Sequence, residues 1–241
     1  MAVAYGAQLF GLKATICVPE DANPDKLAGI ESHGAHIVKF GDAYDNAYQK
    51  ALELQRKTGA TFIHAFDDPD VIAGQGTVGI EIFEDLREFN TVIVPIGGGG
   101  LISGVSVAIK QLKPEAKVIG VEPRGVPSMY NSFRSGRRVE VKEATTIADG
   151  LLAKKPGKLT LRIVKRYVDK IVLVTEDQLK LGILTLLRSS HVLAEAAGAA
   201  ALAALLHEYK PGPDERCVLI VSGANISFDL LSSLLSGQQA K

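Results

Sequence analysis

The stretch Val94-Pro95-Ile96-Gly97-Gly98-Gly99-Gly100-Leu101 decides the fold of this chain. It ends the almost continuously apolar run Thr91–Ile96, which is typical of a parallel strand buried on both faces. A helical pattern follows from about Gly100 to Leu112. Four consecutive glycines leave their backbone N–H groups uncovered by side chains, and at a helix N-terminus such groups suit a phosphate. We therefore predict a phosphate cradle at a strand-to-helix turn.

Two other interpretations of the glycine run remain open. A flexible tight turn would use the same residues, although four glycines carry an entropic cost that a turn does not require. The spacing differs from G-x-G-x-x-G, and no Lys-Ser or Lys-Thr pair follows as in a P-loop, so the pattern disfavours a dinucleotide or nucleoside triphosphate site.

Strand-like and helical patterns alternate along the whole chain at a spacing of 10–15 residues, which predicts a doubly wound α/β fold with parallel sheets. The predicted strands are Ala14–Val18, Ala35–Phe40, Thr61–His64, Thr91–Ile96, Lys117–Val121, Lys170–Val174 and Cys217–Val221. Helical patterns cover residues 24–33, 44–58, 76–88, 100–112, 160–166, 176–189, 191–207 and 227–235.

The composition excludes several classes of protein. The 241 residues carry 27 basic and 27 acidic side chains, so there is no electrostatic case for binding nucleic acid or an anionic membrane, although a local patch stays open. No apolar run approaches the ~18–20 residues that a membrane helix needs. Cys17 and Cys217 lie far apart on apolar runs, which indicates reduced core residues of a cytoplasmic protein.

Four further motifs bear on function, and each also has a plain structural interpretation. Val221–Asn225 ends the last strand, where ligands bind in such folds, but it also suits a turn. Phe66–Thr77 combines an acidic loop with a Gly-Gln-Gly turn, and an acidic loop before a helix is usually a solvated cap. Thr146–Gly150 follows a polar stretch as a turn. The Ala/Gly face after Glu195 more often indicates close helix packing than catalysis.

In this order along the chain, the motifs resemble those of the tryptophan-synthase-β-like (fold type II) family of pyridoxal-phosphate enzymes. Within it they are most similar to the threonine dehydratase and serine racemase branch. The resemblance runs the full length and includes Lys13–Ala22, Phe66–Thr77, Val94–Gly104, Gly120–Pro123 and Ser222–Asn225. It implies two doubly wound domains with mostly parallel sheets: an incomplete small domain, 1–65, and a large cofactor-binding domain, 66–241.

The resemblance also implies roles for single residues. The cofactor phosphate would be held by Gly97, Gly98, Gly99 and Gly100. Ser222 would hydrogen-bond the pyridine nitrogen, and because a hydroxyl cannot protonate that nitrogen, the ring would be a weaker electron sink that favours loss of a β-hydroxyl. Gly150 would line the ring pocket, with Glu195 nearby. Glu122 would be a cation ligand, but Ser128 stands where racemase-like members have a second acidic residue, which leaves a divalent ion, a monovalent ion or none open.

The chain departs from the family in its catalytic residues. No lysine here follows a serine two places earlier, and no Asn-His pair occurs, so both the cofactor-binding lysine and the substrate-carboxylate loop are missing. The apolar, uncapped start at Met1 agrees with this, and we expect an N-terminally truncated enzyme whose first sheet exposes an apolar face.

The function implied is that of a cytoplasmic threonine or serine ammonia-lyase, which uses pyridoxal 5'-phosphate to convert a small amino-acid substrate into a 2-oxo acid and ammonia. Family members are commonly homo-oligomers. Alone, this chain is expected to be inactive, because no residue replaces the lysine. The alternatives are a serine or aspartate racemase, a hydroxyaspartate dehydratase, a non-catalytic cofactor-binding chain, and half of a split enzyme.

Overall fold

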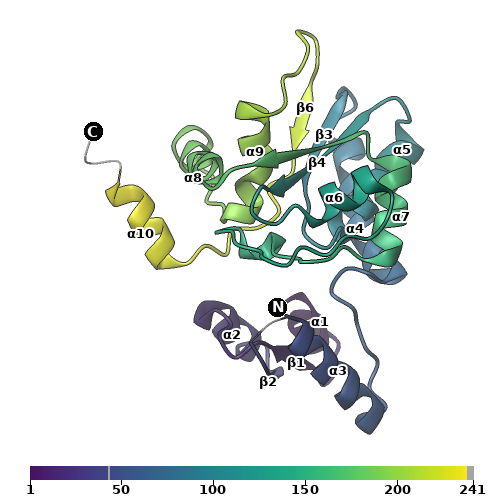
Figure 1. The fold of residues 1–241 in the computed structure, drawn as a ribbon, viewed down its shortest axis with the longest axis vertical. Helices are drawn as coiled ribbons and strands as arrows, with labels where there is room; N and C mark the ends of the chain where they lie inside the picture. The colour runs from purple at the N-terminus through teal and green to yellow at the C-terminus, as the bar shows by residue number, and fades with distance from the viewer. Residues whose placement is uncertain (43, 238–241) are drawn as a thin grey trace. The chain divides into compact units, whose positions relative to one another are not determined.

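The computed structural model describes residues 1–42 and 44–237 (Figure 1). It divides into two units, Met1–Ile63 and His64–Lys241, a boundary two residues before the one expected from the sequence. Both units combine helices with parallel strands, so the predicted α/β class is confirmed. None of the helices in the described ranges is long and apolar enough to cross a membrane.

The first unit consists of α1 (Ala2–Leu9), β1 (Thr15–Val18), α2 (Pro24–Glu31), β2 (His36–Lys39) and α3 (Tyr44–Thr58). Its two strands are parallel, with Thr15 opposite His36. The buried core is small and consists of Ala4, Ile30 and Ala35. Several large apolar side chains at the end of α1 and just after it are exposed, among them Leu9, Phe10 and Leu12.

The expected strand at Thr61–His64 is wrong, because these residues form no regular secondary structure in the described chain. An apolar run becomes a strand only where a neighbouring strand accepts its backbone hydrogen bonds. The sheet of the first unit consists of β1 and β2, and neither pairs with this run.

The second unit is built on a parallel sheet with the strand order β5-β4-β3-β6. Its strands are β3 (Thr91–Pro95), β4 (Lys117–Pro123), β5 (Lys170–Val174) and β6 (Cys217–Leu219). Its helices are α4 (Pro69–Asp85), α5 (Gly100–Leu112), α6 (Ser128–Ser135), η1 (Asp149–Leu151), α7 (Lys158–Tyr167), α8 (Glu176–Thr185), η2 (Leu186–Ser190), α9 (Ala196–His207) and α10 (Phe228–Ser236).

Helices cover both faces of this sheet, as a doubly wound fold requires (Figure 1). Successive residues of a strand point to opposite faces. Accordingly Ile93 belongs to the core formed with α8 and α9, whereas Val92 and Val94 belong to the core formed with α5 and α7. All five residues of β3 are buried, which explains its uninterrupted apolar sequence.

The Gly-Gln-Gly segment lies inside a helix and is not a turn. α4 begins at Pro69, earlier than the predicted Gly76, because the Asp68 carboxylate accepts from the N–H groups of Asp70 and Val71. A Cβ on Gly104 of α5 would lie 2.5 Å from the nitrogen of Gly76. These glycines therefore serve the close packing of α4 against α5.

Candidate functional site

The glycine loop and Ser222 follow two neighbouring strands at the same edge of the sheet. β3 pairs with β6 in parallel, with Ile93 opposite Leu219, and the N–H of Ile220 donates to the carbonyl of Ile93 at 3.1 Å. After β3 and β6 the backbone leaves the sheet at the carboxyl ends of the strands, where ligands bind in open α/β folds. The predicted phosphate cradle and the predicted partner of the ring nitrogen thus lie at adjacent strand ends.

The glycine loop, residues 97–100, is closely surrounded by protein on one side. A Cβ on Gly98 would lie 2.4 Å from the ring of Phe66. Gly99 has φ +97°, a left-handed conformation, and a Cβ there would lie 2.5 Å from Cε of Met129. Close packing and backbone conformation therefore both require glycine here.

The amide groups of the same loop are left open. Within the described part of the chain, the N–H groups of Gly97, Gly98, Gly99 and Gly100 have no hydrogen-bond acceptor. Gly99 and Gly100 are buried, and the N-cap residue Gly99 has no side chain to cap α5. Buried amides without acceptors are unfavourable, and at a helix N-terminus an anion satisfies them best.

Close contacts connect the loop to the other predicted residues. A Cβ on Gly97 would lie 3.2 Å from the carbonyl oxygen of Gly150, and one on Gly150 would lie 3.2 Å from Cβ of Ala197. One on Gly198 would lie 2.3 Å from the carbonyl oxygen of Gly223, the neighbour of Ser222. Gly150 and the start of α9 therefore bridge the space between the glycine loop and the Ser222 turn.

Ser222 itself is exposed, so its hydroxyl is accessible to a ligand. The turn that carries it is fixed by Glu195, the N-cap residue of α9, whose N–H donates to the carbonyl of Gly223 at 3.1 Å. The Glu195 carboxylate also lies against Gly223, because a Cβ there would be 2.1 Å from Oε1. Glu195 thus lies beside the turn that carries Ser222, and its place near a cofactor ring stays a prediction.

Glu122 is buried at the end of β4, and its side chain caps α6. Oε1 accepts from the N–H of Met129 at 2.8 Å, and Oε2 accepts from the N–H of Tyr130 at 2.7 Å. Burial raises the pKa of Glu122 to about 8, against the opposing effect of these hydrogen bonds. The described residues contain no group of three His, Cys, Asp or Glu that could hold a metal ion. The cation role of Glu122 stays a prediction.

The sequence assigns no functional role to two residues beside the glycine loop, Asp67 of the acidic loop and Thr160. Asp67 caps α7, since its carboxylate accepts from the N–H groups of Lys158 (2.8 Å), Leu159 (2.8 Å) and Thr160 (3.1 Å). The hydroxyl of Thr160 donates to the carbonyl of Gly98 at 2.8 Å. The signal for Asp67 was its place in the acidic loop, but its partners lie more than 90 residues away.

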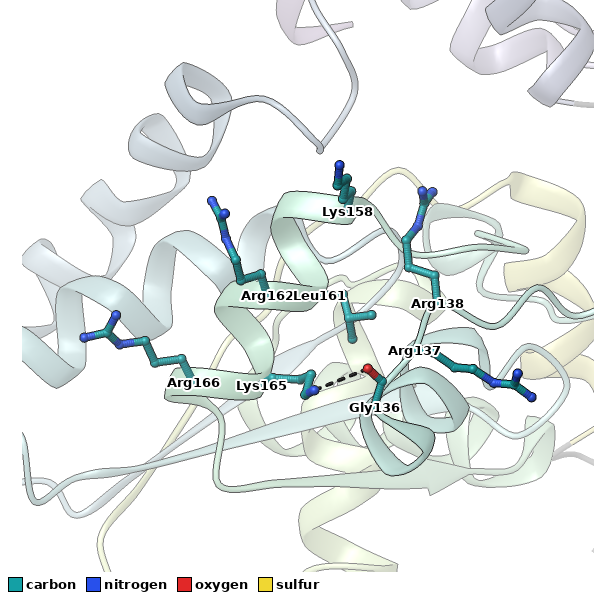
Figure 2. Close-up of a pocket in the computed structure, with 8 residues that line it drawn as sticks. All are labelled: Gly136, Arg137, Arg138, Lys158, Leu161, Arg162, Lys165 and Arg166. Atoms are coloured by element: carbon teal, nitrogen blue, oxygen red, sulfur yellow. Dashed lines mark hydrogen bonds between the residues drawn. The ribbon is translucent and has the colours of Figure 1, made fainter.

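A hollow of about 470 Å³ lies elsewhere in this unit, between α7 and the turn after α6 (Figure 2). Lys165 points at the carbonyl of Gly136 (3.3 Å), whereas the other cationic side chains spread outward. In residues 1–42 and 44–237 none of the six cations forms an ion pair; they are Arg137, Arg138, Lys158, Arg162, Lys165 and Arg166. These six side chains form a local basic patch, a possibility that the zero net charge of the chain did not exclude.

The comparison with known families decides the affiliation of the chain. Residues 1–223 match the family described as pyridoxal-phosphate dependent enzyme. The chain belongs to this family. The resemblance to fold type II enzymes of the threonine dehydratase and serine racemase branch is confirmed.

Individual members of the pyridoxal-phosphate dependent enzyme family are similar over almost the whole chain. An L-threonine ammonia-lyase of Thermotoga maritima is 47% identical over 234 residues, which are 97% of this chain and 58% of that protein. The catabolic L-threonine dehydratase TdcB of Escherichia coli is 40% identical over 96% of this chain and 71% of its own length. Maize serine racemase has a TM-score of 0.91 and 33% identity, covering 99% of this chain and 74% of that one.

Proposed function

We propose that this chain holds the phosphate of pyridoxal 5'-phosphate with the N–H groups of Gly97, Gly98, Gly99 and Gly100. The observation that carries the proposal is the set of open amides at the N-terminus of α5. A phosphate dianion would accept from these groups and gain from the dipole of the helix. The cradle is uncharged, so the site fits a phosphate by hydrogen bonding and needs no lysine or arginine beside it.

The remaining residues of the site fit the rest of the cofactor. We propose that the hydroxyl of Ser222 donates to the pyridine nitrogen, and that Gly150 lines the ring. A neutral serine leaves that nitrogen unprotonated, because a hydroxyl is far too weak an acid to transfer its proton. When bound, pyridoxal phosphate withdraws electrons from the α-carbon of an amino acid.

The reaction we propose for the protein is that of an ammonia-lyase acting on threonine or serine, with loss of the β-hydroxyl and release of a 2-oxo acid and ammonia. It is supported by the threonine ammonia-lyase and dehydratase named above. The chain spans about 58% of the length of the first of these relatives. Because the sequence contains no Ser-x-Lys, we propose that this chain alone does not turn over substrate.

A racemase is the second candidate, and the similarity to maize serine racemase supports it. The two activities differ in their products, since a lyase releases ammonia and a racemase releases the other enantiomer of serine. An assay of a complete enzyme for both products distinguishes them.

The cofactor proposal is tested by equilibrium dialysis of the purified chain against pyridoxal phosphate and, in parallel, against pyridoxal. Clearly tighter binding of the phosphorylated form, competed by inorganic phosphate, is expected. Equal affinity for both compounds would contradict the phosphate cradle. Sustained formation of 2-oxobutyrate from threonine by this chain would contradict the proposal that it is inactive alone.

We further propose a homo-oligomer, and a cytoplasmic location for which the two free cysteines, Cys17 and Cys217, give support. A small amino acid would be the sole substrate class, without a nucleic-acid partner. Light scattering coupled to size exclusion measures the oligomeric state, and a monomer across a broad range of concentration would contradict that part.

A further inference from the structure

We propose that Thr160 is a positioning residue for the phosphate cradle, acting through the carbonyl of Gly98. This inference rests on the proposed function of the glycine loop and extends it to a residue outside the loop. Thr160 belongs to the first turn of α7, is fully buried, and lies 62 positions from Gly98. Its hydroxyl donates to the Gly98 carbonyl at 2.8 Å, and the N–H of Gly157 donates to the same oxygen at 3.3 Å.

The geometry of the peptide group gives this contact its effect. The carbonyl of Gly98 and the N–H of Gly99 belong to one planar unit, and in a trans peptide they point in opposite directions. The described chain contains no cis peptide bond. Two donors at the start of α7, the hydroxyl of Thr160 and the N–H of the N-cap residue Gly157, therefore hold the Gly98 oxygen toward that helix. They thereby turn the Gly99 N–H away from α7, toward the open side of the loop.

A glycine peptide needs such a constraint more than any other. Gly98 and Gly99 lack the Cβ atoms that restrict φ and ψ in other residues, so the peptide between them can rotate at little conformational cost. A rotated peptide would present a carbonyl oxygen to the phosphate, which repels it. The hydroxyl of Thr160 favours the orientation of this peptide group in which the N–H of Gly99 faces the phosphate.

The position of Thr160 is itself fixed by Asp67. The Asp67 carboxylate accepts from three successive N–H groups at the start of α7, including that of Thr160 at 3.1 Å. The hydroxyl of Ser103 in α5 also approaches the carbonyl oxygen of Thr160, at 3.4 Å. Asp67, the first turn of α7 and the Gly98 carbonyl thus form a continuous chain of hydrogen bonds that ends at the cradle.

The test replaces the hydroxyl by a methyl group in Thr160→Val, which keeps the shape of the side chain. Thr160→Ser restores the hydroxyl and serves as the rescue. Thr91→Val is the matched control, because Thr91 is equally buried, donates to Glu215, and lies at the opposite end of β3 from the loop. It reports what the loss of any buried threonine hydroxyl does to this unit.

The first readout is the ratio of the affinities for pyridoxal phosphate and pyridoxal, measured by equilibrium dialysis. In Thr160→Val we expect this ratio to fall by a factor of about 10, which corresponds to one hydrogen bond to a charged group. Thr160→Ser and Thr91→Val should stay within a factor of about 2 of the original chain. An unchanged ratio in Thr160→Val, with the original chain preferring the phosphorylated compound, would overturn the positioning role.

The second readout needs no ligand and keeps the two proposals separate. Hydrogen exchange of the amides of residues 97–101 is compared in the same four proteins without cofactor. We expect faster exchange of this segment in Thr160→Val than in Thr91→Val, after correction for any change in global stability. Equal exchange would overturn the role of Thr160. Failure of the original chain to prefer pyridoxal phosphate would instead count against the proposed function of the loop.

Discussion

The N-termini of α5 and α7 lie side by side in the large unit and differ in one respect. At α7 the three N–H groups of Lys158, Leu159 and Thr160 are occupied by the carboxylate of Asp67. At α5 the N-cap residue is a glycine, and the amides of the loop before it have no acceptor among residues 1–42 and 44–237. The chain supplies its own anion to one helix and leaves the other open to an anion from outside.

The difference shows that an uncapped helix end is informative only beside capped ones. α6 is capped by the buried Glu122, and α4 is capped by Asp68. In a unit that satisfies these helix ends with acidic side chains, the open amides at α5, those of Gly99 and Gly100 being buried, support the proposal that a ligand binds there. The basic hollow in Figure 2 differs from the α5 end in its exposure. Its six cationic side chains are all exposed, so water and salt can screen their charges.

The largest effect is expected at Gly99. Gly99→Ala adds a Cβ 2.5 Å from Met129 and also forces a left-handed conformation on alanine. We expect the free energy of unfolding to fall by about 3 kcal/mol. We also expect the preference for pyridoxal phosphate over pyridoxal to disappear. Gly136→Ala is the matched control, because Gly136 has φ +75° and no atom nearer than 3.5 Å, and about 1 kcal/mol is expected there. Chemical denaturation measures the free energy of unfolding of both variants. Equal losses of stability in Gly99→Ala and Gly136→Ala would refute a special role for the loop.

Removal of the carboxylate at α7 should open the second helix end as well. Asp67→Ala leaves three amides without their acceptor, and we expect a loss of about 2–3 kcal/mol in the free energy of unfolding. Asp68→Ala removes a two-bond cap from α4 and should cost about 1 kcal/mol. If the hydrogen-bonded chain to Gly98 operates, Asp67→Ala alone lowers the affinity for pyridoxal phosphate. The same affinity in both variants would disconnect α7 from the cradle.

The cap of α6 should make stability depend on pH. Burial raises the pKa of Glu122 to about 8 in the folded chain, so the folded state retains a proton that the unfolded state has lost. The stability contributed by this group is complete below the unfolded pKa and is lost as pH rises through about 8. Between pH 5 and pH 8 the free energy of unfolding should fall by on the order of 1 kcal/mol for each pH unit. Denaturation of the original chain and Glu122→Gln across this range measures it, and parallel curves would show that Glu122 does not titrate there.

The smallest effect is expected at the basic hollow. Arg162→Gln removes an exposed charge that forms no hydrogen bond to the glycine loop, and screened charges contribute little. The affinity for pyridoxal phosphate should change by less than a factor of about 2. The measurement is repeated at low and high salt, and a large loss that salt abolishes would mean that the hollow, too, attracts the cofactor.

The sequence predicted the parts of the fold that depend on local patterns. Strand β3 and helix α5 occur where apolar runs and glycines indicated them, and the alternation of patterns predicted parallel sheets. The prediction of a strand at Thr61–His64 is wrong, because a strand needs a neighbouring strand to accept its hydrogen bonds, and the local sequence does not reveal that neighbour. The predicted start of α4 at Gly76 is too late, although Asp68-Pro69 is a local helix-start signal that marks the true start.

The sequence by itself determined the open end of α5, because four glycines after a buried strand offer amides and no side-chain cap. Tertiary structure alone decided what surrounds that end. Asp67 reaches the start of α7, Thr160 reaches the carbonyl of Gly98, and Gly150 lies beside Gly97, all across long stretches of sequence. Hydrogen bonds act over about 3 Å in space whatever the separation along the chain. Their partners are therefore known only once the sheet has brought the loops together.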